Sequence, residues 1–70
     1  MDTRTLRQQL AENVKLARER GGLSKSRLCL MAGISRPILD GIERGDQNIK
    51  LNTLCRLSVV LEKEPWELLR

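Results

Sequence analysis

The stretch that decides the fold runs from Ser24 to Gly45 and is SKSRLCLMAGISRPILDGIERG. Ser24 is a good N-cap for a first short helix, and Gly33 accepts the positive φ that a sharp turn after a helix requires. Ser35 then caps a second helix, in which Pro37 is tolerated because the first turn has no intrahelical use for its N–H. Two short helices joined by a tight turn form a helix-turn-helix unit, which we expect over residues 24–45.

Helical periodicity extends toward the N-terminus of this unit. Four apolar residues recur at i, i+4, i+8 and i+11, which places them on one face of a helix. These residues are Leu6, Leu10, Val14 and Ala17. Thr5 and Gln8 are spaced as a capping box for the start of this helix, and Gly21-Gly22 ends it.

The C-terminal part predicts two further helices. After a polar loop over residues 47–50, residues suited to the interior recur every three to four positions. They are Leu51, Leu54, Leu57, Ser58 and Leu61. Glu64 can cap a last short helix that begins with Pro65. The predicted fold class is all-α, a compact bundle of five short helices that forms one domain over residues 1–70.

The composition excludes several functions. The 70 residues include no His, two Cys and a single aromatic residue, Trp66. The chain therefore lacks the commonest general base and the commonest zinc ligand, and it has no phosphate-cradling glycine loop. Cys29 and Cys55 form no CxxC pair and are expected to be packed thiols. We expect no enzymatic activity, no catalytic residue, no metal and no cofactor.

The charge is positive and unevenly distributed. The chain carries 13 basic and nine acidic side chains, a net charge of +4. Residues 1–36 hold eight basic and three acidic groups, whereas residues 37–70 hold five and six. This excess favours an anionic partner on one end or face. The start, MDTRTLRQQL, has no apolar stretch typical of a signal peptide, and the apolar run over residues 28–34 is too short to span a bilayer. We expect a cytoplasmic protein without membrane contact.

The second helix of the unit has two opposed faces when residues are placed about 100° apart. The apolar face, which can anchor the helix on the bundle, comprises Ile38, Leu39 and Ile42. The outward face comprises Arg36, Asp40, Gly41 and Arg44. A slim, charged helix face fits the major groove of DNA, which is about 12 Å wide and displays donors and acceptors on the base edges. The pattern favours double-stranded DNA as the partner.

Four residues of this helix are candidates for reading bases. Arg36 can bind guanine O6 and N7 with two hydrogen bonds, and Asp40 can accept from cytosine N4 or reject wrong sequences by repelling phosphate. Gly41 permits close approach, and Ile38 at the rim can touch a thymine methyl group.

Contacts to phosphate are expected from the start of the preceding helix, where free N–H groups and the helix dipole favour an anion. The candidates are Ser24, Lys25 and Arg27. Any one basic residue on an exposed helix is usually just solvated. The joint pattern of helix length, glycine turns and opposed apolar and basic faces is what favours DNA binding.

The sequence resembles the Cro/repressor type (Xre-like) of helix-turn-helix proteins, which includes lambdoid phage repressors, restriction-modification controller proteins and many small bacterial regulators. The resemblance extends from about Val14 to Leu69 and is carried by AGISR at 32–36, IERG at 42–45 and WELL at 66–69. It implies a lambda-repressor-like domain of five helices, whose third helix reads operator DNA, usually in a two-fold dimer.

The resemblance also implies roles for individual residues. The matches to base-reading positions are Arg36, Pro37, Asp40 and Gly41. The matches to phosphate-contacting positions are Arg44 and Asn48. Arg18 and Glu43 match an Arg and a Glu that pair between the first and third helices in many members, the alternative being two unrelated surface charges.

Two departures from the family pattern are informative. Lys25 stands where the family usually has a Gln that touches phosphate and braces the recognition helix. Lysine keeps a donor but has no acceptor, which puts that brace in doubt. Glu62 and Lys63 stand where members commonly have Gly and an apolar residue, so we expect a different turn there.

Some apolar residues are candidates for contact with other proteins. Val59 occupies a position that is normally polar, and with Trp66 and Leu69 it can form a patch for homodimerisation. Trp66 belongs either to the core or to this interface. Leu30 and Met31 are also too apolar for the exposed positions expected of them.

These features predict a sequence-specific DNA-binding regulator of transcription. Two recognition helices of a homodimer would read half-sites about 34 Å apart on a near-palindromic operator. The small size leaves no room for a ligand-sensing domain, so no small-molecule ligand is expected, and the resemblance implies that the protein's own promoter is a target. The alternative is an antitoxin-like interaction module with secondary autorepressor activity, for which Leu30, Met31 and Val59 are the hints.

Overall fold

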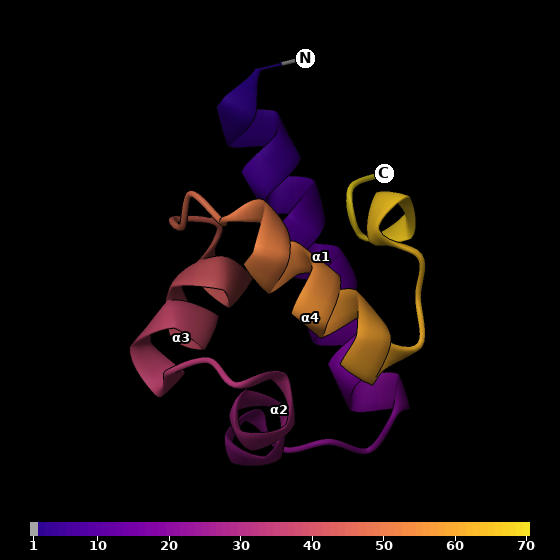
Figure 1. Cartoon of the computed structure of the whole chain (residues 1–70). Coiled ribbons are helices and arrows are strands. Elements are labelled where there is room, and N and C mark those ends of the chain that lie inside the picture. The colour runs from indigo at the N-terminus through magenta and orange to yellow at the C-terminus, as the bar shows by residue number, and fades with distance from the viewer. Residues whose placement is uncertain (1) are drawn as a thin grey trace.

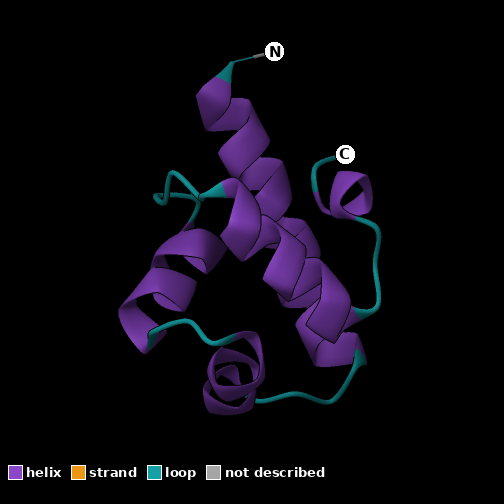
Figure 2. Ribbon diagram, in the orientation of Figure 1, coloured by secondary structure: helices purple, strands orange, loops and turns teal. Residues whose placement is uncertain are grey.

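The computed structural model describes residues 2–70, and these form four α-helices followed by one turn of 3-10 helix (Figures 1 and 2). The elements are α1 (Thr3–Arg20), α2 (Lys25–Ala32), α3 (Arg36–Arg44), α4 (Leu51–Leu61) and η1 (Pro65–Leu68). No strand occurs within residues 2–70, in agreement with the all-α class. None of the helices in this part of the chain is both long and apolar enough to cross a membrane.

The expected fifth helix is only the short turn η1. Its backbone bonds join residues three apart, from Glu67 N to Glu64 O at 2.9 Å and from Leu69 N to Trp66 O at 3.1 Å. The Glu67 carboxylate also folds back to accept from the Glu64 N–H at 2.8 Å. Bonds between residues three apart wind the chain as 3-10 helix, so four of the five predicted short helices are α-helices and the last is a single 3-10 turn.

The start of α1 also differs from the sequence prediction. Asp2 is the N-cap, and its carboxylate accepts from the Thr5 N–H at 2.9 Å, which holds the pKa of Asp2 below its ordinary value. The capping box expected at Thr5 and Gln8 is therefore wrong, because an Asp side chain reaches the same kind of orphan N–H one turn earlier. The predicted stop is correct, since Gly21 is the C-cap.

The core draws on every element. The most fully buried side chains are Val14, Leu28, Leu39, Ile42, Leu57 and Leu68. Two expectations for α4 are wrong: Leu51 is exposed at the start of the helix, and Cys55 is exposed one turn later. Cys29 is packed in the core as expected, and burial raises the pKa of its thiol.

α1 is the central support of the fold. It contacts α3, α4 and η1, while α2 contacts α3 and α4. In Figure 1, α3 and η1 lie on opposite sides of the crossing of α1 and α4. The helix-turn-helix unit and the C-terminal turn therefore present separate surfaces to solvent.

Candidate nucleic-acid interface

The predicted helix-turn-helix unit is present with the predicted caps. Ser24 accepts from the Arg27 N–H at 3.0 Å and Ser35 from the Ile38 N–H at 3.4 Å, and Gly33 and Gly45 end α2 and α3 in the left-handed conformation. These residues satisfy backbone groups that a short helix leaves without partners. The local sequence therefore defines both ends of the recognition helix.

α3 has the two opposed sides that its sequence predicts. Leu39 and Ile42 are buried, and Ile38 is half-buried against the core. Arg36 and Arg44 are exposed on the other side. Packing of the apolar side onto the bundle thus directs the charged side toward solvent.

A buried ion pair joins α3 to α1. Arg18 Nε lies 2.8 Å from Glu43 Oε2, and Arg18 Nη2 lies 3.2 Å from Glu43 Oε1. Both side chains are largely buried, and Arg18 Nη1 also donates to the carbonyl of Leu23 at 3.0 Å. The hydrogen bonds to Glu43 raise the pKa of Arg18. This paired arrangement fixes the roll of α3 about its own axis, because the two planar groups meet in only one orientation.

A second charged cluster lies on the outer side of α3. Asp40 Oδ1 accepts from Lys25 Nζ and from Arg36 Nε, both at 3.3 Å. Partial burial alone would raise the pKa of Asp40, but the hydrogen bonds from Lys25 and Arg36 outweigh it, so the pKa lies below its ordinary value. The Asp40 side chain is about one third exposed and pairs with two cations of the same chain, and its role at base edges stays a prediction.

The same cluster supplies the brace that the Lys at position 25 had put in doubt. The Lys25 ammonium, at the start of α2, reaches the Asp40 carboxylate in the middle of α3. Arg36 Nη1 also donates to Ser26 Oγ at 3.3 Å. Two polar bridges therefore connect α2 with the recognition helix, although no glutamine stands at position 25.

An open hollow of about 440 Å³ adjoins this cluster. It is lined by Lys15, Lys25, Arg36, Asp40, Glu43 and Arg44. Because Arg18 pairs with Glu43 and two cations share Asp40, the rim of the hollow is positive overall. The sequence interpretation did not single out Lys15, although its place one turn before Arg18 put it on the side of α1 that meets α3.

Two of the other predicted contact residues, Arg44 and Asn48, already have partners in the chain. Arg44 Nε lies 2.9 Å from Asp46 Oδ2, with both side chains exposed, and Asn48 Oδ1 accepts from Arg7 Nη1 at 3.1 Å. Arg27 is exposed on α2, and no side-chain partner for it occurs within residues 2–70. Arg27 therefore has a guanidinium that is freer than that of Arg44 to meet a phosphate.

Gly41 is not at the exposed surface, contrary to the prediction of close approach to DNA. It is buried in the middle of α3. A Cβ atom added there would lie 3.0 Å from Oε1 of Gln47, a residue of the loop that follows α3. The absence of a side chain at position 41 thus provides space for the side chain of Gln47.

The proposed dimer residues lie outside the core to different extents. Val59 is 77% exposed and Trp66 is 57% exposed, with the Arg70 guanidinium 5.0 Å from the centre of the indole ring. Leu69 is half-buried against the core. The alternative that Trp66 is a core residue is therefore wrong.

The exposed apolar residues of α4 form a stripe of their own. Leu51, Cys55 and Val59 are spaced four apart and are all exposed, whereas Leu54, Leu57 and Leu61 are buried. On α2, Leu30 is 77% exposed, and Met31 is exposed beside it. Two helices thus present apolar side chains to solvent.

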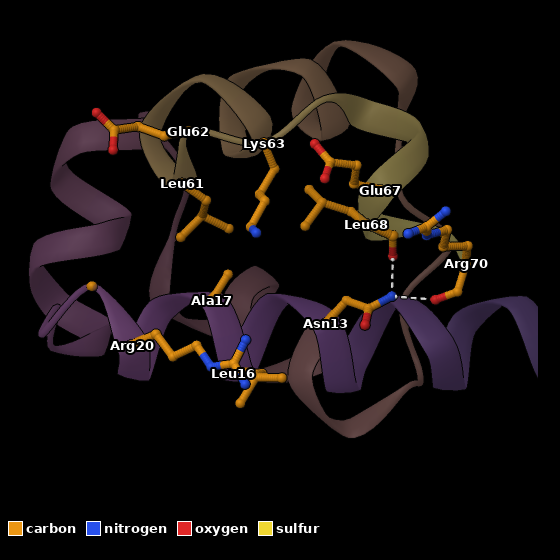
Figure 3. Close-up of a pocket in the computed structure, with 11 residues that line it drawn as sticks. Asn13, Leu16, Ala17, Arg20, Leu61, Glu62, Lys63, Glu67, Leu68 and Arg70 are labelled. Carbon is orange, nitrogen blue, oxygen red and sulfur yellow. Dashed lines mark hydrogen bonds between the residues drawn. The ribbon is translucent and has the colours of Figure 1, made fainter.

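A separate hollow of about 430 Å³ lies between α1, the end of α4 and η1 (Figure 3). Asn13 of α1 reaches across it and donates to the carbonyl oxygens of Leu68 at 3.0 Å and Arg70 at 2.7 Å. Its rim carries both signs of charge, from Arg20, Lys63 and Glu67. The residues of the helix-turn-helix unit do not line this hollow, and the bonds from Asn13 attach η1 to α1.

Comparison with known proteins identifies relatives over most of the chain. The profile of the helix-turn-helix family HTH_3 matches residues 14–68. The chain is 33% identical over 64 residues to control protein C.SmaI from Serratia marcescens, an alignment that covers 91% of this chain and 76% of that protein.

Solved structures give the same result. The restriction-modification controller protein C.AhdI from Aeromonas hydrophila superposes with a TM-score of 0.84 at 31% identity, covering 89% of this chain and 94% of that one. The hypothetical transcription factor NHTF from Neisseria has a TM-score of 0.89 at 31% identity, covering 97% and 76%. An HTH_3 family transcriptional regulator from Vibrio cholerae has a TM-score of 0.88 at 27% identity, covering 96% of this chain and 38% of that one.

Proposed function

This chain belongs to the helix-turn-helix family HTH_3 and is a DNA-binding regulator of transcription, and on this premise we propose that it binds a near-palindromic operator as a homodimer. The family is one of transcription regulators and not of enzymes. The resemblance to restriction-modification controller proteins is confirmed. We further propose that residues 1–70 act as one domain and that the operators include one at the protein's own promoter.

The observation that carries this proposal is the placement of Arg36 at the first position of α3. Its Nε and Nη1 make hydrogen bonds of 3.3 Å to Asp40 and Ser26, while Nη2 makes none within residues 2–70. Bonds of 3.3 Å are long for N–H···O bonds, so the guanidinium can exchange them for the O6 and N7 atoms of a guanine at small cost. Pro37 and Ile38 then lie beside Arg36 as apolar contacts for a thymine methyl group.

Phosphate contacts follow from the cations around α3. We assign them to Lys25 and Arg27 at the start of α2 and to Ser24 through its position at that helix end. Arg44, at the end of the recognition helix, and Asn48, in the loop after it, also belong to this set. Lys15 joins this set because it lines the positive hollow beside Arg36. Such contacts set the register on the duplex and carry no sequence information directly.

A pair of variants tests the division between base and phosphate contacts. Arg36→Ala should cost about 1 to 3 kcal/mol of specific binding and relax the preference at one base pair of each half-site. Arg27→Ala should weaken binding to all sequences alike and reduce the slope of log K against log salt by about one for each half-site, or about two for the homodimer. Arg27 is preferred to Lys25 here because Lys25→Ala would also release Asp40. Equal losses on operator and random DNA for Arg36→Ala would refute its base-reading role.

Homodimerisation is proposed because one short recognition helix reads few base pairs. Two helices related by two-fold symmetry, spaced by about 34 Å, add their contacts and require a near-palindromic site. The exposed apolar stripe on α4, made of Leu51, Cys55 and Val59, supports an interface at Val59, Trp66 and Leu69. Such a stripe on so small a domain is costly to leave in water.

Matched substitutions test this interface. Val59→Asp should raise the dimer dissociation constant in sedimentation and weaken operator binding, because a carboxylate would be buried between the two copies. Leu30→Asp is the control, since Leu30 is exposed to the same 77% but lies on α2. Loss of the dimer with Leu30→Asp and not with Val59→Asp would relocate the interface to α2.

A second candidate function, an antitoxin-like interaction module, is favoured by Leu30 and Met31. Both are exposed on α2, and no partner for them occurs in the part of the chain that the structure describes. Purification of the untagged protein from its native host, before and after Leu30→Asp, distinguishes the two functions. A bound toxin that is lost with Leu30→Asp favours the module, whereas a homodimer free of other proteins favours the operator-binding regulator.

A further inference from the structure

Gln47 lies across the recognition helix at the point where α3 has no side chain. Its Oε1 is 3.0 Å and its Cβ is 3.5 Å from the place that a Cβ of residue 41 would occupy. Arg44 Nη2 lies 3.9 Å from the same place, and Gly41 is buried beneath these side chains. The outer side of α3 is therefore completed at this level by a residue from the following loop.

The end of α3 explains how a loop residue reaches this position. Gly45 adopts a left-handed conformation with φ of 80°, and the N–H of Asp46 donates back to the carbonyl oxygen of Gly41 at 2.9 Å. This C-terminal capping motif turns the chain back along the last turn of the helix. Gln47, the next residue, then lies beside Gly41 and not beyond the end of α3.

The two flanks of α3 offer different chemistry. On one flank, Lys25, Asp40 and Arg36 form the charged cluster. On the other, the half-buried Gln47 borders a hollow of about 260 Å³ together with Ser35 and Ile38. Lys50 and Arg56 also line this hollow, so both flanks of the recognition helix carry cations, and the Gln47 flank adds an uncharged carboxamide.

The Gln47 carboxamide is also uncommitted. Its neighbours in sequence are engaged, Asp46 with Arg44 and Asn48 with Arg7. Within residues 2–70, however, no hydrogen bond involves the Gln47 side chain. A carboxamide has both a donor and an acceptor, and it pairs with the N6 and N7 atoms of adenine through two hydrogen bonds.

We propose that Gln47 is a specificity-determining residue, whose carboxamide, lying across Gly41, reads a base pair different from the one that Arg36 contacts and favours adenine there. The proposal rests on the proposed placement of α3 in the major groove. It assigns to a loop residue the role that a side chain at position 41 would otherwise have.

The test is selection of binding sites from duplexes with a randomised half-site, followed by sequencing. Gln47→Ala should reduce the preference at one base pair by about fivefold to about 100-fold. Binding to random DNA should stay within about twofold of wild type, because the substitution removes no charge. Arg36→Ala, run in parallel, should alter a different base pair.

A second variant displaces the Gln47 carboxamide without changing residue 47 itself. Gly41→Ala places a Cβ 3.0 Å from Oε1, and the flexible end of Gln47 has to move away. Alanine favours a helix over glycine, so this variant remains folded. It should relax the same base pair as Gln47→Ala.

Gln8→Ala is the matched control. Gln8 Nε2 lies 3.0 Å from the place of a Cβ at Gly45, as Gln47 Oε1 does at Gly41, but Gln8 belongs to α1. Its loss should leave every base preference unchanged. If Gln47→Ala weakens all sequences equally, or changes no preference while Arg36→Ala does, the proposal is wrong and the proposed function stands. If neither variant changes a preference, both assignments are wrong.

Discussion

The helix-turn-helix unit and the C-terminal part of the chain end their helices in different ways. In α2 and α3 each N-cap is a serine whose hydroxyl accepts a backbone N–H, and each C-cap is a left-handed glycine. In α4 the N-cap is Lys50, whose side chain makes no capping bond within the described residues. Its C-cap is Glu62, left-handed at φ of 57° although it has a Cβ.

This difference shows which part of the fold is encoded locally. The helix-turn-helix unit carries at each helix end the residue that its backbone requires, so its geometry depends little on the rest of the chain. α4 lacks these signals and is held by burial of Leu54, Leu57 and Leu61. The part that presents Arg36 to DNA is thus defined by its own sequence, whereas α4 depends on packing.

The largest expected effect comes from breaking the buried ion pair that joins the helix-turn-helix unit to α1. Glu43→Gln leaves the Arg18 cation buried without a counter-charge and should lower the free energy of unfolding by about 3 kcal/mol or more in urea titrations. Asp46→Asn, at the exposed pair with Arg44, is the control and should cost less than about 0.5 kcal/mol. The double variant Arg18→Met with Glu43→Leu should recover most of the loss, because no charge is then left buried. A small effect of Glu43→Gln would show that α3 is held by apolar packing alone.

Substitution of the N-cap residues of α2 and α4 tests the difference between the helix-turn-helix unit and α4. Ser24→Ala removes the acceptor for the Arg27 N–H and should lower the free energy of unfolding by about 1 kcal/mol. Lys50→Ser adds a capping hydroxyl where none is present and should raise it by up to about 1 kcal/mol. Thermal unfolding followed by circular dichroism measures both. Effects of the same sign would contradict the difference in local encoding.

Variants of two C-cap residues, Glu62 of α4 and Gly33 of α2, should have smaller effects on stability, and these effects should have opposite signs. Glu62→Gly relieves the left-handed backbone of a residue with a Cβ and should stabilise the protein by about 0.5 to 1 kcal/mol. Gly33→Ala introduces that strain at φ of 68°, where no atom within 4 Å opposes the new Cβ, and should destabilise by about 1 kcal/mol. Urea unfolding of both variants is the measurement, and operator binding by Glu62→Gly should be unchanged.

The smallest effect concerns pH and lies in the helix-turn-helix unit. The pKa of Asp40 is lower in the folded protein than its ordinary value of 3.8, because the hydrogen bonds from Lys25 and Arg36 outweigh the opposing effect of burial. A lowered folded pKa contributes stability above the unfolded pKa, and this contribution is lost as the pH falls through the folded value. Between about pH 5 and pH 2, Asp40→Asn should therefore lose less stability than wild type. Parallel unfolding curves for the two proteins would show that the cluster contributes nothing.

The helix-turn-helix unit was predictable from sequence because its signals are local. Ser24, Gly33 and Ser35 mark helix ends through backbone groups within a few residues of them. The opposed faces of α3 follow from periodicity, and Leu39 and Ile42 are buried as that periodicity predicts. The family resemblance added the pairing of Arg18 with Glu43, whose geometry in the structure is that of a buried ion pair.

The errors concern residues whose surroundings come from another element. The outward direction of Asp40 follows from its own helix, but its contact with Lys25 of α2 does not. Gly41 was placed on the open surface, yet Gln47 of the next loop covers it. Leu51 fits the spacing of the buried face of α4, but its side chain is 80% exposed at the start of that helix, whereas Leu54 in the same turn is buried.

The helix ends of the helix-turn-helix unit and the direction of its apolar faces could be read from the order of residues, because each depends on interactions within a turn or two of the chain. The excess of positive charge toward the N-terminus could be read in the same way. The partners of Asp40, the covering of Gly41 by Gln47 and the left-handed turn at Glu62 required the folded chain. Those features arise where helices and loops distant in sequence meet, and there packing outweighs local preference.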